Sequence, residues 1–392
     1  MIDFISPESN LITAMIRFRQ DIHSFPELAF NEFRTAQKVE EVLLTNGFEV
    51  HTGIAETGVV GVLHGARGQD GPSVMFRADM DALPVSELTG RTYCSQHEGV
   101  MHACGHDGHV AMLLTAAVHI AQNNDFSGTL YFLFQPAEEN LGGAKAMIED
   151  GLLERFPPQM VFGIHNWPEL PAGQASASTG AVMASHATFD ITVTGEGCHA
   201  ACPEDGQDVV LTSSQLIAAM NTISARSVSP LDSAVVSVTS INSGNSYNAL
   251  PAQAAMKGTV RYLKPETGPL LRKRIEEIIQ GISVASGCSI ELDYIERYPP
   301  TVNALSPTEL ARDCLKSVPG ITNVVDTLPA SMCAEDFSFI LEQIPGCYIW
   351  LGNGSDATSS PLHSPFYDFN DEVLVTGANY WVSLTNRLMV AP

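Results

Sequence analysis

The amino-acid sequence predicts an α/β fold that is interrupted by a compact α+β unit. Short runs of β-branched and apolar residues alternate with helical stretches as far as Gly180, the pattern then changes, and the alternation resumes near Pro300. Alternating strands and helices form a sheet with helices packed on its faces. Because 392 residues exceed what one ordinary hydrophobic core accommodates, we expect two domains.

The N-terminal part begins with a helix. Apolar residues recur at helical spacing between Ser9 and Ser24, and Pro26 ends the run because a proline disfavours helix in the residue before it. The elements expected next are strands at residues 59–63, 74–76, 129–134 and 160–164 and helices at residues 110–121 and 143–149.

The stretch after Gly180 predicts a self-contained βαββαβ unit. Its expected elements are strands at residues 187–194, 234–242, 253–263 and 288–297 and helices at residues 208–224 and 267–285. A strand at 348–351 and a closing helix at 371–388 follow it. We therefore expect residues 1–183 and 298–392 to form one discontinuous α/β domain, with a mixed central sheet and helices on both faces, and residues 184–297 to form the inserted α+β domain.

Composition excludes several classes of protein. The chain has 20 basic and 44 acidic side chains, so its net charge of −24 would repel nucleic acid and anionic membrane surfaces. The N-terminal sequence MIDFISPESN has neither a basic region nor a long apolar run, which predicts a cytoplasmic protein without a membrane anchor. The eight cysteines are scattered, so we expect most of them to be reduced.

Residues that bind metals or transfer protons gather in a few short tracts, three of which lie at or just beyond the ends of predicted strands. The tracts are RADMDALP at 77–84, MHACGHDGH at 101–109, QPAEEN at 135–140, GIHNW at 163–167 and LHSP at 362–365. In MHACGHDGH, Gly105 separates Cys104 from His106 and allows the backbone to bend so that both side chains face one ion.

The number of candidate ligands favours two metal ions. Cys104, His106, Glu139, His165 and His363 offer one thiolate, one carboxylate and three imidazoles, which are too many for a single tetrahedral zinc. Glu138, beside Glu139, is the natural general base if the local turn aims one carboxylate at the metal and the other at a water. In a regular strand the two would point to opposite faces, so an irregular backbone is expected there.

Other histidines and cysteines in these tracts have simpler interpretations. His102 and His109 are interpreted as supports of the ligands or as helix packing. Cys198-His199-x-x-Cys202 could suggest a zinc site, but a structural site normally needs four ligands and no second pair is evident. A redox protein that uses Cys104 as its thiol is a further alternative, which chelation would leave active.

These tracts resemble those of a known family, the hippurate hydrolase and N-acyl-amino-acid amidohydrolase group of cocatalytic metallopeptidases. The resemblance covers nearly the whole chain and includes RADMDALP, MHACGHDGH and GIHNWPELPAG, and also HSFPELAFNE at 23–32, FQPAEEN, NSYNALP at 245–251, GTVR at 258–261, AEDF at 334–337 and LHSPFYDFND at 362–371. Cys198, Cys202 and Cys333 depart from the family's pattern and are interpreted as neutral or as tuning the pocket.

The resemblance implies metal ligands at Cys104, His106, Glu139, His165 and His363, with Cys104 shared by the metal pair. It implies that Glu138 deprotonates the attacking water and then protonates the leaving amine, and that Asp79 steadies a catalytic or metal-bound group. The inserted unit would be a lid that mediates homodimerisation, or higher homo-oligomerisation. In it, His199 would support the oxyanion, either in its own site or in the partner subunit's site, and Asn248 and Arg261 would lie near the substrate.

The reaction expected from this resemblance is metal-dependent hydrolysis of the amide bond of an N-acyl amino acid. The cofactors would be two divalent ions of zinc, manganese, cobalt or nickel. Dipeptidase or carboxypeptidase action is the main alternative, because the same metal centre cleaves any amide and the pocket selects the acyl group. A catalytically silent binding protein is the other alternative.

Overall fold

The chain forms two compact units. The computed structural model describes residues 1–139, 141–354 and 360–389. Unit 1 comprises Met1–Gly180, Val302–Pro329 and Asp336–Pro392, and unit 2 comprises Ala181–Thr301 and Ala330–Glu335. The chain thus enters unit 2 after residue 180 and leaves it after residue 301. The sequence pattern predicts these two boundaries after residues 183 and 297. Residues 330–335 also belong to unit 2.

Unit 1 is an α/β structure. Its helices are α1 (Asn10–Ser24), α2 (Phe33–Thr45), α3 (His106–Gln122), α4 (Gly143–Glu149), α5 (Leu152–Arg155), α9 (Leu305–Leu315), α10 (Ser338–Leu341) and α11 (Leu374–Met389), with a 3-10 turn at Asp371–Val373. Its strands are β1 (Glu49–Ile54), β2 (Gly58–His64), β3 (Ser73–Asp79), β4 (Thr129–Gln135), β5 (Met160–Pro171), β6 (Gln174–Ser176), β13 (Asn323–Val325) and β14 (Gly346–Gly354). Short strands β7 (Gly180–Met183) and β12 (Thr301–Asn303) span the points where the chain passes between the units.

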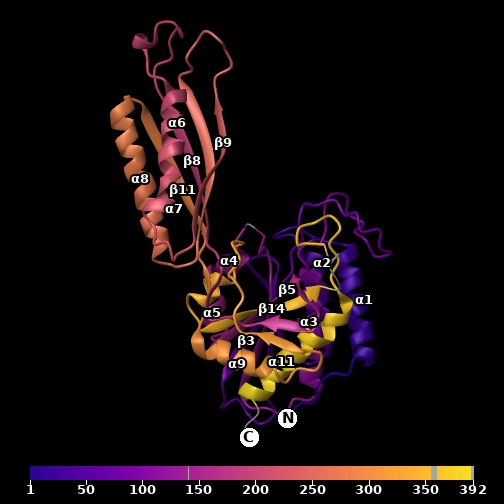
Figure 1. Cartoon of the computed structure of the whole chain (residues 1–392). Helices are drawn as coiled ribbons and strands as arrows, with labels where there is room; N and C mark the ends of the chain where they lie inside the picture. Colours follow the sequence, from indigo (N-terminus) through magenta and orange to yellow (C-terminus); the bar gives the residue numbers. More distant parts are fainter. Residues whose placement is uncertain (140, 355–359, 390–392) are drawn as a thin grey trace. The chain divides into compact units, whose positions relative to one another are not determined.

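The sheet of unit 1 is mixed, as the sequence predicts. Its strands lie in the order β1-β2-β4-β3-β5-β14-β6-β13, and the central strands β4, β3, β5 and β14 run parallel. Figure 1 labels three of these central strands, β3, β5 and β14. Strand β2 pairs antiparallel with β1 on one side and with β4 on the other. Helix α3 packs with α1, α2 and α11, while α4 packs with α5 and α10. The predicted α/β fold with a mixed sheet is confirmed.

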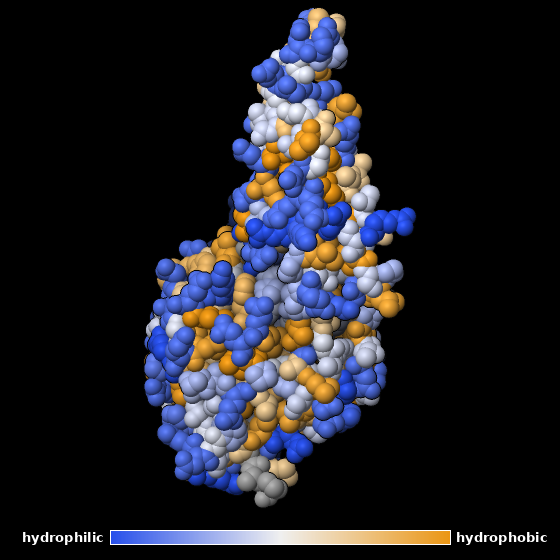
Figure 2. All heavy atoms as spheres, turned by 90° about the vertical axis from the view of Figure 1, so that its left-hand side faces the viewer, coloured by the Kyte–Doolittle hydropathy of each residue, from blue (hydrophilic) through white to orange (hydrophobic). Residues whose placement is uncertain are grey.

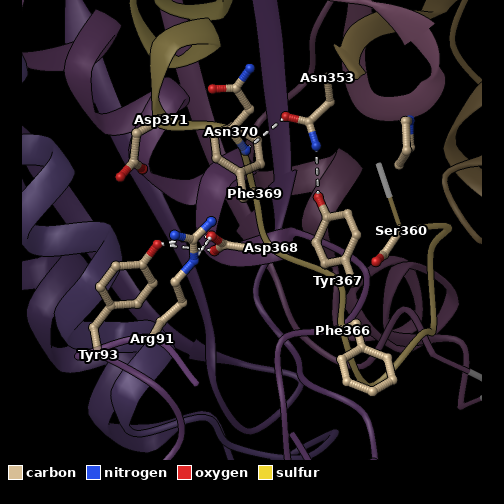
Figure 3. Close-up of a pocket in the computed structure, with 11 residues that line it drawn as sticks. Arg91, Tyr93, Asn353, Ser360, Phe366, Tyr367, Asp368, Phe369, Asn370 and Asp371 are labelled. Atoms are coloured by element: carbon tan, nitrogen blue, oxygen red, sulfur yellow. Dashed lines mark hydrogen bonds and ion pairs between the residues drawn. The ribbon is translucent and has the colours of Figure 1, made fainter. Parts of the chain in front are cut away.

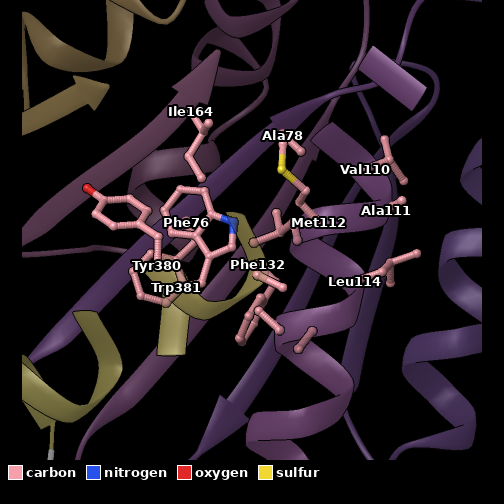
Figure 4. Packing of buried hydrophobic residues seen from close by; sticks show 14 of the residues in the cluster. Phe76, Ala78, Val110, Ala111, Met112, Leu114, Phe132, Ile164, Tyr380 and Trp381 are labelled. Atoms are coloured by element: carbon pink, nitrogen blue, oxygen red, sulfur yellow. The ribbon is translucent and has the colours of Figure 1, made fainter. Parts of the chain in front are cut away.

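Bulky apolar side chains fill the core of unit 1. Trp381 of α11 packs on Phe76 of β3 with ring centroids 4.9 Å apart, and Met112 of α3 lies in the same cluster (Figure 4). Helix α3 is buried along almost its whole length, which explains its mostly apolar sequence after His109. Replacing a buried aromatic residue of this size by alanine costs about 3–5 kcal/mol.

Unit 2 has one antiparallel sheet with helices on one of its faces. It contains β8 (His186–Thr194), β9 (Ala234–Ser243), β10 (Gln253–Tyr262), β11 (Ser289–Tyr298), α6 (Val209–Met220), α7 (Thr222–Arg226), α8 (Thr267–Ser286) and a 3-10 turn at Pro203–Asp205. The strand order is β11-β8-β10-β9. Alternate residues of β8 and β10, such as Phe189 and Met256, face Leu216 and Ile275 of the helices. The predicted βαββαβ order is present.

Two local differences from the sequence prediction have physical causes. The helix expected over 208–224 is two helices, and at the junction the Asn221 side chain donates 2.8 Å to the carbonyl of Ile217. The sequence pattern does not predict helix α2, because only a narrow stripe of this helix is buried. The apolar residues of the stripe are Ala36, Val39 and Leu43.

The surface and the cysteines agree with the composition. Figure 2 shows polar residues over most of the viewed face, with hydrophobic residues in small groups between them. All eight cysteines lie in the described part of the chain and are free thiols. No helix within the described ranges is both long enough and apolar enough to cross a membrane.

Candidate metal centre

Three parallel strands bring three of the tracts to one edge of the sheet. Asp79, the last residue of β3, lies opposite Gln135, the last residue of β4. On the other side of β3, Arg77 lies opposite Gly163 of β5, two residues before His165. The carboxyl ends of neighbouring parallel strands meet at the same edge, which is where open α/β sheets place their sites.

The turn before α3 carries the fourth tract. Gly105 has φ +90°, and a Cβ atom there would lie 2.5 Å from Asn166 Nδ2 and 2.6 Å from Tyr367 Oη. Only glycine therefore fits between Cys104 and His106. Both side chains are buried, and together with His165 they form one group whose ligand atoms all lie within 4.8 Å of one another.

A second group contains the same thiol. Cys104, Glu139 and His363 also have ligand atoms within 4.8 Å of one another. His363 has φ +64°, an unusual value for a residue with a side chain, and its N–H donates 2.8 Å to the carbonyl of Ala103. Its Nε2 lies 3.2 Å from Glu139 Oε1. The five predicted ligands therefore form two triads that share Cys104.

Hydrogen bonds already select which nitrogen of His165 faces the centre. Nδ1 of His165 donates 2.7 Å to the carbonyl of Asn166. Nε2 consequently carries the lone pair and lies 3.4 Å from the Cys104 sulfur. The Nδ1 atom of His106 lies 3.3 Å from Asp81 Oδ1. Both ring nitrogens of His106 are buried and have no hydrogen-bond partner among the residues that the structure describes.

Glu138 follows an irregular backbone, as the pairing of adjacent carboxylates requires. Strand β4 ends at Gln135, and Ala137 then has φ +54°. Glu138 is 7 % exposed, and its Oε1 accepts the N–H of Asp336 at 3.3 Å. Ligand atoms of Glu138, Glu139 and His106 also lie within 4.8 Å of one another. The predicted base therefore lies against the predicted ligands.

Asp79 and His109 form a buried pair beside the ligands. Oδ1 of Asp79 accepts Nδ1–H of His109 at 2.6 Å, and the N–H of Asn166 donates 3.0 Å to His109 Nε2. Both ring nitrogens of His109 are thus engaged in hydrogen bonds. Asp79, His106 and His109 are close enough to form a metal-binding group. Because its nitrogens are engaged, we assign His109 as a residue that supports the ligands. Oδ2 of Asp79 accepts from Arg77 at 2.8 Å and lies 3.7 Å from His106 Nε2.

His102 packs behind the centre. It is 1 % exposed, and neither ring nitrogen has a hydrogen-bond partner among the described residues. Burial lowers the pKa of His102 to about 4, so the ring is neutral at physiological pH. Its ring centroid lies 6.2 Å from that of His23, in keeping with a packing role.

The electrostatics of the cluster fit bound cations. Burial and the carboxylates of Glu139 and Glu138 raise the pKa of the Cys104 thiol well above its usual range. Burial alone would lower the pKa of His106, but the Asp79 and Asp81 carboxylates outweigh it and raise the pKa to about 10. A surplus of buried negative groups thus surrounds the thiol, and divalent cations are the charge that such a donor set accepts.

The three predicted substrate residues lie in unit 2. His199 and Asn248 are exposed and adjacent, since the N–H of Ala200 donates 3.0 Å to the Asn248 carbonyl and His199 pairs with Ala249. Arg261 is half-buried near the end of β10, where it donates to the Val260 carbonyl at 3.1 Å. The structure therefore brings His199 and Asn248 together but not Arg261.

The sequence patterns do not predict the role of several residues at the centre. Asp81 and Glu32 accept hydrogen bonds from the backbone around Glu138. Arg77, which is fully buried, donates to Asp79 at 2.8 Å and to Asp336 at 3.0 Å. Arg77 and Asp81 lie in the RADMDALP tract, so their signal was one charge within a buried strand and another two residues beyond its end.

A cavity of about 400 Å³ adjoins this network (Figure 3). Its polar lining includes the ion pair of Arg91 with Asp368 at 2.8 Å. Tyr367 forms part of its wall and donates 2.5 Å to Asn166 Oδ1, while Asn166 Nδ2 donates 2.7 Å to the Cys104 carbonyl. The cavity is thus connected through hydrogen bonds to the turn that carries the ligands.

The mixed α/β sheet, with two triads of metal-ligating side chains and a buried carboxylate at one edge, defines a metal-binding hydrolase. Residues 75–387 match the peptidase family M20/M25/M40, and the chain belongs to this family. Like the relatives described below, it is a hydrolase that acts on amide bonds.

Two curated relatives and one solved structure illustrate the match. The hippurate hydrolase of Campylobacter jejuni is 42% identical over 373 residues, which cover 95% of this chain and 96% of that protein. The N-acetyl-L-cysteine deacetylase of Bacillus subtilis is 35% identical over 97% of this chain and 89% of its own length. The crystal structure of the YXEP protein of Bacillus subtilis, a dinuclear metal-binding peptidase of the M20 family, superimposes with a TM-score of 0.84 at 31% identity and covers 95% of this chain and 97% of that one.

Proposed function

We propose that this protein hydrolyses the amide bond of N-acyl amino acids, with two divalent cations held at the edge of the unit 1 sheet. The observation that carries the proposal is the convergence of all five predicted ligands in two triads that share Cys104, with Glu138 grouped with two of them, His106 and Glu139. Cys104, His106 and His165 form one triad, and Cys104, Glu139 and His363 form the other. Because the triads share the thiol, the arrangement supports two ions with Cys104 between them.

The chain's own residues then act on the proton and on the substrate. Divalent cations bound by the two triads would polarise the amide carbonyl and lower the pKa of a water. Glu138 accepts the proton of the attacking water and returns it to the leaving amine. The N–H of Asp336 holds Glu138 Oε1 at 3.3 Å and keeps the carboxylate directed toward the cluster. Asp79, which accepts hydrogen bonds from Arg77 and His109, holds these two side chains in place on the buried side of the centre.

Substrate recognition is assigned to unit 2. An arginine suits the free carboxylate of an acylated amino acid, which supports Arg261 as its partner. His199 and Asn248 lie next to the first residue of β10, just outside the strand, whereas Arg261 lies within β10, eight residues after its first residue. Eight residues of strand span about 26 Å, which exceeds the length of an N-acyl amino acid. We therefore propose that His199 supports the oxyanion in the partner subunit's site of a homodimer.

The hydrolase relatives support N-acyl amino acids as the substrate class, because one is named for hippurate and another for N-acetyl-L-cysteine. Imidazole, carboxylate and thiolate ligands suit zinc, while manganese, cobalt and nickel remain the other candidates. The cytoplasmic location predicted from the sequence stays a prediction.

The experiment is a substrate panel on protein stripped of metal and reloaded with zinc, manganese, cobalt or nickel. N-acetyl, N-benzoyl and longer N-acyl amino acids are compared with dipeptides, and the initial rates are measured. We expect the highest kcat/KM on an N-acyl amino acid and no hydrolysis after chelation. A preference for dipeptides would assign peptidase action to the same centre, and no hydrolysis with any metal would refute an enzymatic function.

A further inference from the structure

Two arginines and a histidine lie side by side on the open face of the unit 2 sheet, the face without helices. Arg261 comes from β10, His186 from the neighbouring strand β8, and Arg297 from β11 on the other side of β8. Val260 pairs with Ala187, so Arg261 is next in register to His186. Neighbouring strands are about 4.8 Å apart, so both arginine side chains are long enough to reach over the histidine.

A cavity of about 380 Å³ lies on this face. Its lining includes His186 and Arg297 and, from the next row across the sheet, the paired residues Thr188 and Thr259. The guanidinium of Arg261 is turned back along β10 toward the cavity, because its Nη1 donates 2.5 Å to Thr259 Oγ1. The three basic side chains therefore gather at one cavity within unit 2.

Among the residues that the structure describes, no carboxylate pairs with either arginine. Arg261 donates to the Thr259 hydroxyl and to the Val260 carbonyl. Arg297 is exposed, and its acidic neighbour Glu296 interacts with Arg272 of α8, which belongs to the helices on the other face. The two positive charges at the cavity are therefore not neutralised by the chain itself.

The acidic groups of the cavity lie at its other end. Asp190 and Asp293 face each other across β8 and β11, and Lys257 lies 3.3 Å from Asp190. Asp190 is four residues from His186 along β8, a distance of about 13 Å. The basic end and the acidic end of the cavity are thus separate.

The charges of both arginines act on His186. Burial and then the charges of Arg261 and Arg297 lower the pKa of His186 to about 4. The ring is neutral at physiological pH and offers one N–H donor, so the basic end carries two permanent positive charges. Neighbouring like charges on adjacent strands are destabilising, and a bound anion would offset that cost. In a chain with a net charge of −24, such a pair without acidic partners indicates a ligand.

We propose that Arg261, His186 and Arg297 form a binding site for a ligand with two negative charges. Two ligands share this chemistry: the two carboxylates of an acidic N-acyl amino acid such as N-acyl glutamate, and a free dianion such as inorganic phosphate. The substrate is favoured because Arg261 is already assigned to the free carboxylate of the amino acid, so that Arg297 would bind the carboxylate of its side chain. This choice of ligand rests on the proposed function, whereas the anion site itself does not.

The first experiment compares N-acetyl-L-glutamate with N-acetyl-L-glutamine, which has a similar shape and no charge on its side chain. Values of kcat/KM are measured for the metal-loaded parent, for Arg297→Gln and for Arg274→Gln, a control that makes the same change on the exposed surface of α8. If the substrate occupies the site, Arg297→Gln lowers kcat/KM for the glutamate about 10- to 100-fold and changes the glutamine value less than about threefold. Arg297→Lys, which keeps the charge, should recover part of the loss, and Arg274→Gln should change neither value.

The second experiment is a calorimetric titration of the same proteins with inorganic phosphate and with N-acetyl-L-glutamate. Phosphate bound by the metal ions is subtracted by comparing the parent with Arg297→Gln, because this substitution leaves the metal ligands intact. Phosphate affinity at least about tenfold weaker in Arg297→Gln, with no discrimination between the two acetylated amino acids, would assign the site to a free dianion.

The anion site is refuted if Arg297→Gln binds and hydrolyses every one of these ligands as the parent does. An equal loss on the glutamate and on the glutamine would also refute it, because the effect would then not depend on the second charge. If the parent hydrolyses no N-acyl amino acid, the proposed function fails, and the calorimetric comparison still decides whether the site exists.

Discussion

The candidate residues of unit 1 and those of unit 2 are held in different ways. In unit 1 the base and its neighbours are buried and are fixed by partners far away in the chain, such as Asp81 for Glu138 and Asn166 for His109. In unit 2, His199 and Asn248 are exposed, and the hydrogen bonds of their side chains are with near neighbours, Ala201 and Ser246. We therefore expect substitutions at the unit 1 centre to affect metal binding and the chemical step, and substitutions of Asn248 and Arg261 in unit 2 to affect substrate binding.

The largest expected effect comes from Glu138→Gln, which removes the proton acceptor and preserves the shape of the side chain. We expect kcat to fall about 10²- to 10⁴-fold, with metal content and KM little changed. Steady-state hydrolysis of N-benzoylglycine and elemental analysis measure these quantities. The exposed Glu149 on α4 offers the control Glu149→Gln, which should retain full activity. Equal rates for Glu138→Gln and the parent would show that another group is the base.

A smaller effect concerns stability and pH in the buried network behind the centre. Burial alone would lower the pKa of His23, but Asp107, at 2.8 Å, and Glu87, at 3.3 Å, outweigh it and raise the pKa to about 9. Because the folded-state pKa exceeds the unfolded value, the stabilisation is complete below about pH 6.5 and is lost as the pH rises through 9. We expect the free energy of unfolding to fall by on the order of 3 kcal/mol over this window.

Urea unfolding at several pH values measures this slope. His23→Gln should remove most of it, while His64→Gln, at an exposed position, should leave it unchanged. A parental slope in His23→Gln would assign the pH dependence to other groups.

In unit 2 the expected effect is on substrate binding alone. Arg261→Gln removes a charged donor, so we expect KM for N-acyl amino acids to rise about 10- to 100-fold. Lys257 lies four residues earlier on the same face of β10 and pairs with Asp190 at 3.3 Å, so Lys257→Gln is the matched control. Kinetics and metal content are measured together. Metal loss in Arg261→Gln would contradict the division between the units.

The smallest effect is expected at the unit 2 thiols. Cys202→Ser changes a partly exposed side chain and should alter the free energy of unfolding by less than about 0.5 kcal/mol, with no change in metal content. Cys288→Ser is the comparison, because Cys288 is buried in the unit 2 core and should cost about 1–3 kcal/mol. Loss of a bound ion from Cys202→Ser would instead revive a zinc site at Cys198-His199-x-x-Cys202.

The sequence predicts much of this architecture because the signals are local. Strand ends, the glycine between Cys104 and His106, and the adjacent Glu138 and Glu139 are all visible as short patterns. Their convergence follows from the rule that parallel strands present their carboxyl ends at one edge.

The short sequence patterns do not predict contacts between residues that are far apart in the chain. Asp81 is separated from Glu138 by 57 residues, and Glu32 from Ala137 by 105 residues. Nothing in the local sequence of Asp81 or Glu32 predicts which backbone N–H groups donate hydrogen bonds to them. The sequence does not predict the positive φ at Ala137 either, since alanine carries no turn signal.

The most direct test of the central claim is a metal titration of the stripped protein. Hydrolysis of N-benzoylglycine is followed as zinc or manganese is added in fractions of an equivalent, with Cys104→Ser beside the parent. The two triads that share Cys104 predict no activity without metal, a plateau at two equivalents per chain, and a weakened second binding step in Cys104→Ser. Full activity in the metal-free protein, or a plateau at one equivalent, would contradict a two-ion centre.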